Sequence, residues 1–122
     1  MNMTIETLPY LTDEEKKILL DLGSRIRVFL GDRLVRMVLF GSKARGDFQK
    51  DSDIDVAIIV KDLDRKLKDE IYTIVAKVEY KYLRSIASIA FSEEHFNDLL
   101  ERERRIARDI QDEGIPIKYN KF

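Results

Sequence analysis

Cysteine is absent from this chain of 122 residues, which excludes disulfide bridges and metal sites built on thiolates. An excess of charge is also lacking: 22 basic residues stand against 23 acidic ones, so no overall field draws the chain to nucleic acid. No apolar run approaches the ~20 residues of a membrane-spanning helix, and the first residues lack the basic-then-apolar pattern of a secretory signal. We therefore expect a cytoplasmic protein, with neither a membrane nor nucleic acid as its partner.

The length of the chain is sufficient for one compact core and too short for two. We expect a single domain over residues 1–122, in which residues 1–11 and 115–122 are peripheral. Apolar residues make up 44% of the chain and charged residues 37%, a balance that argues against disorder.

The spacing of the apolar residues predicts a mixture of helices and strands. Continuous apolar runs are typical of strands covered on both faces, and spacing by three and four residues is typical of amphipathic helices. On this basis we expect strands over residues 34–40, 54–60 and 85–91, and helices over residues 13–30, about 65–83 and 92–114.

Two aspartates at the mouth of the second predicted strand suggest a metal site. Asp53 and Asp55 are two residues apart, so in an extended chain their carboxylates lie on the same face, about 6–7 Å apart. Two like charges this close are costly unless a cation lies between them, and Mg²⁺ or Mn²⁺ prefers oxygen ligands of this kind. Mg²⁺ commonly completes its shell with water and with phosphate oxygens of a substrate.

The bend after the first predicted strand has the chemistry of an anion site. Gly41 allows backbone N–H groups to approach a phosphate, and Ser42 can cap a short helix with its hydroxyl toward the same anion. Lys43 and Arg45 add positive charge, and Gly46 ends this polar segment. Each fragment alone also fits a plain turn or a solvated strand end. Together they indicate a pocket for a nucleoside triphosphate.

The order of these residues resembles the signature of the polymerase-β-type nucleotidyltransferases. The chain reads GSKARGD at residues 41–47 and DSDID at residues 51–55, which fulfils the whole pattern G-S-x-x-x-G-x-x-x-x-x-S-D-x-D. The order of the predicted elements and the length also fit the small prokaryotic minimal nucleotidyltransferases. The resemblance covers most of the chain and implies an α+β fold of the polymerase-β-like nucleotidyltransferase type, with a small mixed sheet flanked by helices.

The resemblance also implies an activity and a set of site residues. Members of this family transfer a nucleoside monophosphate, here AMP from ATP, to a hydroxyl group, and the match assigns Asp53 and Asp55 to catalysis and to binding Mg²⁺ or Mn²⁺. The nucleotide would be held by the residues of the two motifs, namely Gly41, Ser42, Lys43, Arg45, Gly46 and Ser52. Similar small proteins are often antitoxins that adenylylate a HEPN-domain toxin, so a HEPN-type protein is the expected partner. Whether the chain also forms a homo-oligomer stays open.

In one respect the sequence departs from the family pattern. Catalytic members commonly have a third carboxylate on the strand that corresponds to residues 85–91, and that position falls near Ser88, where this strand contains no acid. The third carboxylate would help to hold the metal and would accept the proton of the attacking hydroxyl, help that is worth ~10²–10⁴-fold. Three outcomes stay open: catalysis with two acids and one metal, an acid such as Glu93 or Glu94 that moves in, or little turnover.

Two other functions stay open on the sequence alone. The chain could be a binding module that neutralises its partner by docking, with a vestigial nucleotide pocket, and the empty Ser88 position favours this alternative. A nucleotidyltransferase directed at a drug or a nucleic acid is the other, although so short a chain has no second domain to clamp such an acceptor.

Overall fold

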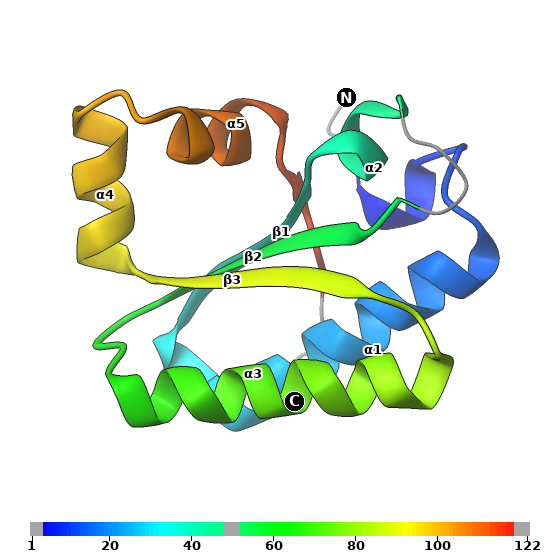
Figure 1. The fold of residues 1–122 in the computed structure, drawn as a ribbon, viewed down its shortest axis with the longest axis horizontal. Helices are drawn as coiled ribbons and strands as arrows, with labels where there is room; N and C mark the ends of the chain where they lie inside the picture. The colour runs from blue at the N-terminus through cyan, green and yellow to red at the C-terminus, as the bar shows by residue number, and fades with distance from the viewer. Residues whose placement is uncertain (1–3, 48–51, 119–122) are drawn as a thin grey trace.

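The computed structural model describes residues 4–47 and 52–118. It shows a four-stranded sheet with helices on both faces (Figure 1). No helix within these residues has an apolar stretch long enough to cross a membrane. The predicted class, α+β with a small mixed sheet flanked by helices, is confirmed. In chain order the elements are η1 (Ile5–Thr7), α1 (Asp13–Leu30), η2 (Gly31–Arg33), β1 (Leu34–Phe40), α2 (Ser42–Arg45), β2 (Ile54–Val60), α3 (Arg65–Tyr82), β3 (Ile86–Ser92), α4 (Glu93–Glu101), α5 (Arg105–Glu113) and β4 (Ile115–Pro116).

The topology of the sheet brings the two sequence motifs together. The strand order is β3-β2-β1-β4; β1 is antiparallel to both β2 and β4, whereas β2 and β3 are parallel. The end of β1 therefore lies at the same end of the sheet as the starts of β2 and β3. Phe40, the last residue of β1, pairs with Asp55, which in turn pairs with Ala87 of β3. Gly41 and Asp55 are thus neighbours at one end of the sheet.

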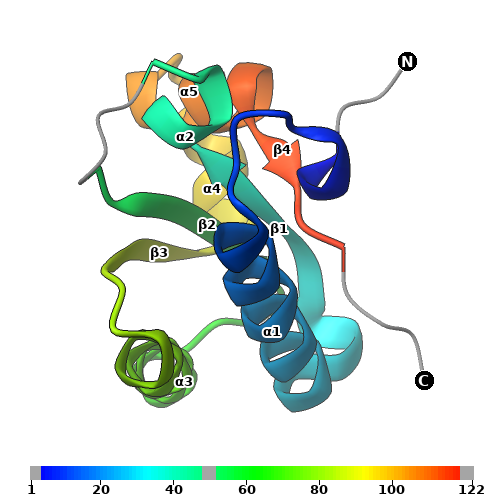
Figure 2. The ribbon, with the colours of Figure 1, turned by 90° about the vertical axis from the view of Figure 1, so that its right-hand side faces the viewer.

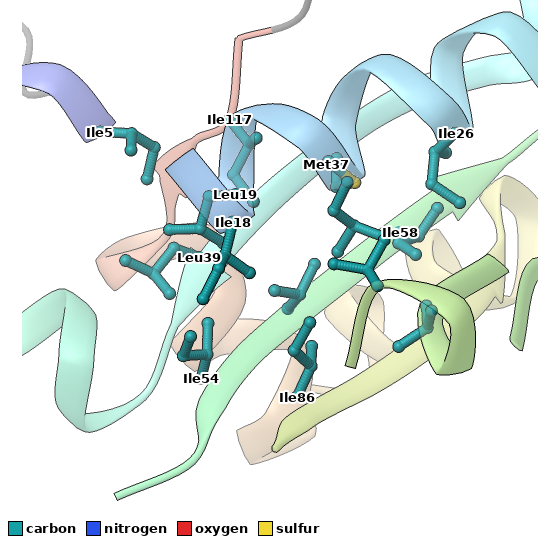
Figure 3. Packing of buried hydrophobic residues seen from close by; sticks show 14 of the residues in the cluster. Ile5, Ile18, Leu19, Ile26, Met37, Leu39, Ile54, Ile58, Ile86 and Ile117 are labelled. Carbon is teal, nitrogen blue, oxygen red and sulfur yellow. The ribbon is translucent and has the colours of Figure 1, made fainter. Parts of the chain in front are cut away.

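Alternating side chains of the strands are divided between two apolar cores. On one face, residues such as Met37, Leu39 and Ile58 pack against α1 and α3 (Figure 3). On the other face, residues such as Val38 and Ile59 pack beneath α4 and α5. Because helices cover both faces (Figure 2), the central strands β1 and β2 are apolar almost throughout, as their continuous apolar runs predicted.

The first long helix begins and ends where the sequence predicted. Thr12 accepts a hydrogen bond from the backbone N–H of Glu15, and the Glu15 carboxylate accepts one from the backbone N–H of Thr12, both at 3.0 Å. This reciprocal capping box fixes the start of α1. Gly31, with a φ of 57°, follows its last residue, Leu30.

The single helix that we predicted over residues 92–114 is wrong, because the chain forms two helices there. A continuous helix would direct Glu103 toward the apolar sheet, since Glu103 falls at helical spacing between Leu100 and Ala107. Instead Glu103 takes a φ of 55° and is exposed, so that α4 and α5 each bury an apolar face. Ile106, which we expected to face inward, is 39% exposed.

The segment before α1, which we expected to be peripheral, contributes to the core. Ile5 is 1% exposed, Leu8 is 0% exposed and Leu11 is 5% exposed, all within the cluster that packs on α1. After α5, β4 pairs with β1, and Ile117 is also buried. Residues at both ends of the described chain are therefore part of the apolar core.

Candidate active site

The predicted carboxylates lie at the end of the sheet where β1 ends and β2 begins. Asp53 precedes β2 by one residue and is exposed, whereas Asp55 is the second residue of β2 and is partly buried. Their charges interact directly, because the negative charge of Asp53 contributes to raising the pKa of Asp55. The two aspartates therefore lie at the same end of the sheet, the end where β2 begins, which faces the viewer in Figure 2.

The bend at Gly41 touches the carboxylate of Asp55. Gly41 has a φ of 73°, and a Cβ atom on it would lie 2.3 Å from Oδ2 of Asp55. Only glycine fits here, because any side chain would displace Asp55 and the positive φ would strain it. We expected Ser42 to cap α2, but Gly41 is the N-cap residue and Ser42 is the first helical residue. The backbone at the start of α2 thus lies directly against Asp55.

The electrostatics of Asp55 fit a site for a divalent cation. Burial raises the pKa of the Asp55 carboxyl, the negative charge of Asp53 raises it further, and the positive charge of Arg45 offsets part of this. A carboxylate that is hard to ionise gains most from a neighbouring cation. Within residues 4–47 and 52–118 no group of three or more His, Cys, Asp or Glu side chains could hold a metal ion, so phosphate and water oxygens would have to complete the shell.

Neutralising Asp55 is expected to stabilise the protein in the absence of metal. The raised pKa means that the fold disfavours the ionised carboxylate, so wild-type stability decreases as pH rises above the ordinary Asp value of 3.8. Asp55→Asn should therefore raise Tm at pH 7 by a few degrees, since removing such functional-site strain commonly yields about 0.5–2 kcal/mol.

Calorimetric melting at pH 7 and pH 3, with and without Mg²⁺, checks this expectation. The higher Tm of Asp55→Asn relative to the wild type should disappear at pH 3. Mg²⁺ should raise the Tm of the wild type but not that of Asp55→Asn. Asp62→Asn, at the far end of β2, is the matched control, and Mg²⁺ should raise its Tm as it raises that of the wild type. A lower Tm for Asp55→Asn at pH 7 without metal would contradict the expectation.

Arg45 lies beside the carboxylates, on the exposed side of α2. It forms ion pairs with Asp47 at 3.1 Å and with Glu113, near the end of α5, at 3.0 Å. Its charge acts on Asp55, as the pKa of that group indicates. Arg45 is thus placed to act on an anion near Asp55 and also ties α2 to α5.

Lys43 does not lie where the sequence suggested. We expected it to assist nucleotide binding, but its side chain is 2% exposed and its Nζ lies 2.7 Å from Oε2 of Glu15, which is also 2% exposed. Glu15 Oε2 accepts a second hydrogen bond from Arg84, at 2.9 Å. Lys43 therefore acts beneath α2, as part of a buried ionic cluster that joins α1, α2 and the α3–β3 connection, and is unavailable to a phosphate.

The charge of Glu15 is strongly favoured in this cluster. Burial alone would raise its pKa, but hydrogen bonds from Lys43, from the backbone of Thr12 and from Arg84 outweigh burial and lower the pKa from 4.5 to about 2. Because the pKa in the folded state is lowered, the stabilisation is complete above pH 4.5 and is lost as pH decreases toward about 2.

Replacing Lys43 by methionine is expected to destabilise the fold. Removing one partner of a buried ion pair costs about 3–5 kcal/mol, and since Arg84 still contacts Glu15 we expect about 3 kcal/mol, or roughly 10 °C in Tm. The loss should shrink as pH falls from 5 to 2, because wild-type Glu15 becomes protonated. Lys17→Met, an exposed change on the same helix as Glu15, is the control. Equal Tm values for the two variants would contradict the assignment of Lys43 and Glu15 to a buried ion pair.

Gly46 and Ser52 complete the predicted set of nucleotide-binding residues. Gly46 ends α2 with a φ of 84°, and a Cβ atom there would lie 3.0 Å from the ring of Tyr10. The Tyr10 hydroxyl donates a hydrogen bond to the carbonyl of Ala44, so the segment before α1 supports α2 from below. Ser52 is partly buried and directly precedes Asp53. Residues 48–51, which include the first residue of the second motif, lie outside the described residues.

The position beside Asp55 on β3 is Ala87, not Ser88. In the parallel register Asp55 pairs with Ala87, whereas Ser88 pairs with Val56. Since successive residues of a strand point to opposite faces, Ser88 lies on the face that α1 and α3 cover. The residue of β3 that shares the face of Asp55 is therefore Ala87, one residue before the Ser88 named from the sequence. Ala87 is exposed, and it too is not an acid.

Glu93 and Glu94 cannot supply the missing acid. They follow Ser92, which pairs with Val60 at the far end of β2. Five residues of strand separate Val60 from Asp55, which corresponds to about 16 Å. That outcome of the sequence analysis is excluded for this arrangement of the strands.

Sequence reasoning missed four residues that shape this site. Glu15 was assigned only to the capping box, and Arg84 and Tyr10 carry no local pattern that links them to α2, so only the tertiary structure reveals their contacts. Ala87 also could not be found from the sequence, because the residue of β3 that shares the face of Asp55 is decided by the register of β3 against β2.

Comparisons with known proteins agree with this geometry. The sequence model of the family described as "Nucleotidyltransferase domain" matches residues 15–117, and the chain belongs to this family of transferases. A relative from Methanocaldococcus jannaschii, named "Putative protein adenylyltransferase MJ0141", is 38% identical over 76 residues, which is 62% of this chain and 77% of the relative.

Two solved structures share the fold. A toxin–antitoxin crystal structure with AMP-PNP matches with a TM-score of 0.56 and 17% identity over 87% of this chain and 74% of that chain. A structure described as a "putative minimal nucleotidyltransferase" matches with a TM-score of 0.50 and 23% identity over 93% of this chain and 96% of that chain. At these identities the likeness concerns the fold alone, and it agrees with the resemblance seen in the sequence.

Proposed function

We propose that this nucleotidyltransferase transfers AMP from ATP to a hydroxyl group of a partner protein, with Mg²⁺ or Mn²⁺ held by Asp53 and Asp55. The observation that carries the proposal is the contact between the bend and the carboxylate: a Cβ atom on Gly41 would lie 2.3 Å from Oδ2 of Asp55. An anion bound by the backbone at the start of α2 would therefore lie beside the carboxylates. That is the arrangement a metal-bound triphosphate requires.

Each residue has a separate task in the proposed reaction. Asp53 and Asp55 would hold the divalent ion, which when bound neutralises charge on the triphosphate and polarises the reacting phosphorus. Ser42 and the backbone N–H groups at the start of α2 would bind the terminal phosphates, and Arg45 would add positive charge nearby. Catalysis would thus depend mainly on positioning and on electrostatics.

The bonds in the transfer balance without a further reagent. The acceptor oxygen forms a bond to the α-phosphorus of ATP while the bond from that phosphorus to the oxygen bridging to the β-phosphate breaks. Pyrophosphate leaves with that electron pair, and the hydroxyl proton passes to solvent, since Ala87 offers no base. The products are an adenylylated acceptor and pyrophosphate.

A protein acceptor is supported by the relative from Methanocaldococcus jannaschii, whose name is that of a protein adenylyltransferase. A toxin partner is suggested by the fold neighbour that is a toxin–antitoxin structure. We propose a HEPN-domain toxin as the acceptor to try first, as the sequence resemblance implies, and the cytoplasm as the place of the reaction.

Transfer of label from ATP to a protein tests the proposal. The purified chain is incubated with Mg²⁺, with ATP labelled at the α-phosphate, and with the protein encoded by the adjacent gene. Labelled acceptor together with released pyrophosphate is the expected result, and ATP labelled at the γ-phosphate should leave the acceptor unlabelled. Label from the γ-phosphate would instead indicate a kinase-like reaction and contradict the proposal.

A second candidate function rests on Ala87. Because no acid lies beside Asp55 on β3, the chain could neutralise its partner mainly by docking, with slow transfer. In that case Asp53→Asn with Asp55→Asn would still inhibit the partner in an activity assay of the partner. Loss of inhibition in the double variant, together with loss of label, would favour adenylylation as the mode of neutralisation.

A further inference from the structure

Arg45, beside the proposed metal site, has two nitrogens of its guanidinium group paired with carboxylates. Its Nε lies 3.1 Å from Oδ2 of Asp47, and its Nη1 lies 3.0 Å from Oε2 of Glu113. Burial and the charge of Asp53 raise the pKa of Asp55, and the charge of Arg45 offsets part of that rise. The positive charge of Arg45 is therefore shared among several anions.

The two ion-pair partners of Arg45 come from different parts of the chain. Asp47 follows Arg45 by two residues and belongs to the same segment. Glu113 is 68 residues further along the chain and is the last residue of α5. Figures 1 and 2 show α5 beside α2, at the end of the sheet where β2 begins. Glu113 therefore brings to this end of the sheet a charge that neither sequence motif contains.

The backbone of Glu113 is fixed, so that only its side chain can change position. Gly114 packs so closely that a Cβ atom on it would lie 2.2 Å from the carbonyl oxygen of Ile110 and 3.2 Å from Cγ2 of Val38. β4 begins at the next residue and pairs with β1. The side chains of Glu113 and Arg45 are nevertheless 35% and 42% exposed. An ion pair with this much access to water is weak, so it can exchange partners at small cost.

The charges of the protein around this site disfavour a triphosphate. Arg45 brings one positive charge to the region, against four carboxylates, which belong to Asp47, Asp53, Asp55 and Glu113. A divalent ion on the two metal-site aspartates offsets only their own charges. Since a strong contact with phosphate uses two parallel N–H groups of the guanidinium fork, a triphosphate gains most from Arg45 once a carboxylate has left it.

We propose that Glu113 is a positioning residue that competes with the triphosphate for Arg45. In the nucleotide-free protein, Glu113 holds Arg45 toward α5. When the metal-bound triphosphate binds, Arg45 exchanges the Glu113 carboxylate for a phosphate oxygen, and that carboxylate turns to solvent. After transfer, Glu113 competes for Arg45 again and so favours the release of pyrophosphate. This inference rests on the proposed function and adds a residue, outside both motifs, that sets the affinity for nucleotide.

A purely structural role of the Glu113–Arg45 pair predicts a different change in nucleotide binding. If Glu113 served only to tie α2 to α5, neutralising it would loosen α2, and nucleotide would bind as before or more weakly. If Glu113 competes with nucleotide, neutralising it leaves Arg45 more available, and nucleotide binds more tightly. The sign of the change in Kd therefore distinguishes the two roles.

The test is calorimetric titration of Glu113→Gln with α,β-methylene-ATP and Mg²⁺ at low ionic strength, where partly exposed charges interact most strongly. We expect this variant to bind the nucleotide about three- to fivefold more tightly than the wild type, since a partly exposed ion pair shifts an equilibrium by about this factor. Titration with pyrophosphate and Mg²⁺ should show a similar gain. The Tm without ligand should change by less than about 5 °C.

Two further variants show whether the effect is specific and passes through Arg45. Asp112→Asn is the matched control, because it removes the same charge from the preceding residue of α5, which points about 100° away around the helix. It should bind nucleotide as the wild type does. In the background of Arg45→Gln, Glu113→Gln should change Kd by less than about twofold, because the competition needs both side chains.

Unchanged or weaker nucleotide binding by Glu113→Gln would overturn the competition, as would an equal gain for Asp112→Asn. A full gain in the background of Arg45→Gln would also overturn it, since Glu113 would then repel the nucleotide directly. The fate of the proposed function is read separately. Tighter nucleotide binding by Glu113→Gln, without label transfer by the wild type, would leave the competition intact and count against AMP transfer. Absence of nucleotide binding by the wild type would overturn both.

Discussion

Replacing both Asp53 and Asp55 by asparagine is expected to lower AMP transfer by at least about 10³-fold. Holding the metal across the triphosphate supplies several kcal/mol of transition-state stabilisation, and each 1.36 kcal/mol corresponds to a factor of ten. The protein should remain folded, because neutralising Asp55 removes a charge that the fold disfavours. The measurement is the initial rate of label transfer at saturating ATP, Mg²⁺ and acceptor.

Asp62→Asn is the control for this loss. Asp62 is exposed, lies two residues after the end of β2, and has a φ of 52°, which asparagine tolerates. Its rate should equal that of the wild type. Label transfer that survives in the Asp53/Asp55 variant, with Asp62→Asn also active, would place the chemistry elsewhere in the molecule.

Ala87→Asp is expected to raise the rate of transfer, by about 10²-fold. The new carboxylate would stand beside Asp55 on the neighbouring strand, where paired Cβ atoms are about 5 Å apart. There it could share the metal and accept the proton of the attacking hydroxyl, help that is worth ~10²–10⁴-fold when the geometry is right. Since Ala87 is exposed, an added charge costs little stability.

Ser88→Asp tests whether the position of the added carboxylate matters, because it adds the same charge one residue away from Ala87. Ser88 lies on the face packed against α1 and α3, so this variant should gain no activity and should lose stability through the burial of a charge. The comparison uses the kcat of both variants at saturating acceptor. A gain for Ser88→Asp but not for Ala87→Asp would mean that the register of β3 differs from the one described here.

Much of the fold and the centre of the site could be predicted because their causes are local. The capping box of Thr12 and Glu15 and the apolar runs of β1 and β2 each depend on a few neighbouring residues. Gly41 and Asp55 could be assigned together because the spacing between their motifs is specific, and an antiparallel pair of strands brings them to one end of the sheet.

The rest could not be read from the sequence, because it depends on contacts between distant segments. The lysine of the first motif could face a phosphate or the core, and only the packing of α1 decides that Lys43 pairs with Glu15. The break at Glu103 keeps this acid out of the apolar core beneath α4 and α5, and so depends on how both helices pack on the sheet. The choice between Ala87 and Ser88 depends on a one-residue register, which reverses the face of every side chain.

Calorimetric titration with α,β-methylene-ATP, which cannot release pyrophosphate, tests most directly whether Asp53 and Asp55 gather a divalent ion beside the bend at Gly41. We predict binding in the presence of Mg²⁺, binding at least about tenfold weaker without it, and loss of the Mg²⁺-dependent gain when both aspartates are replaced by asparagine. Equal affinity for the nucleotide in the wild type and the double variant, with Mg²⁺ present, would contradict the proposed site.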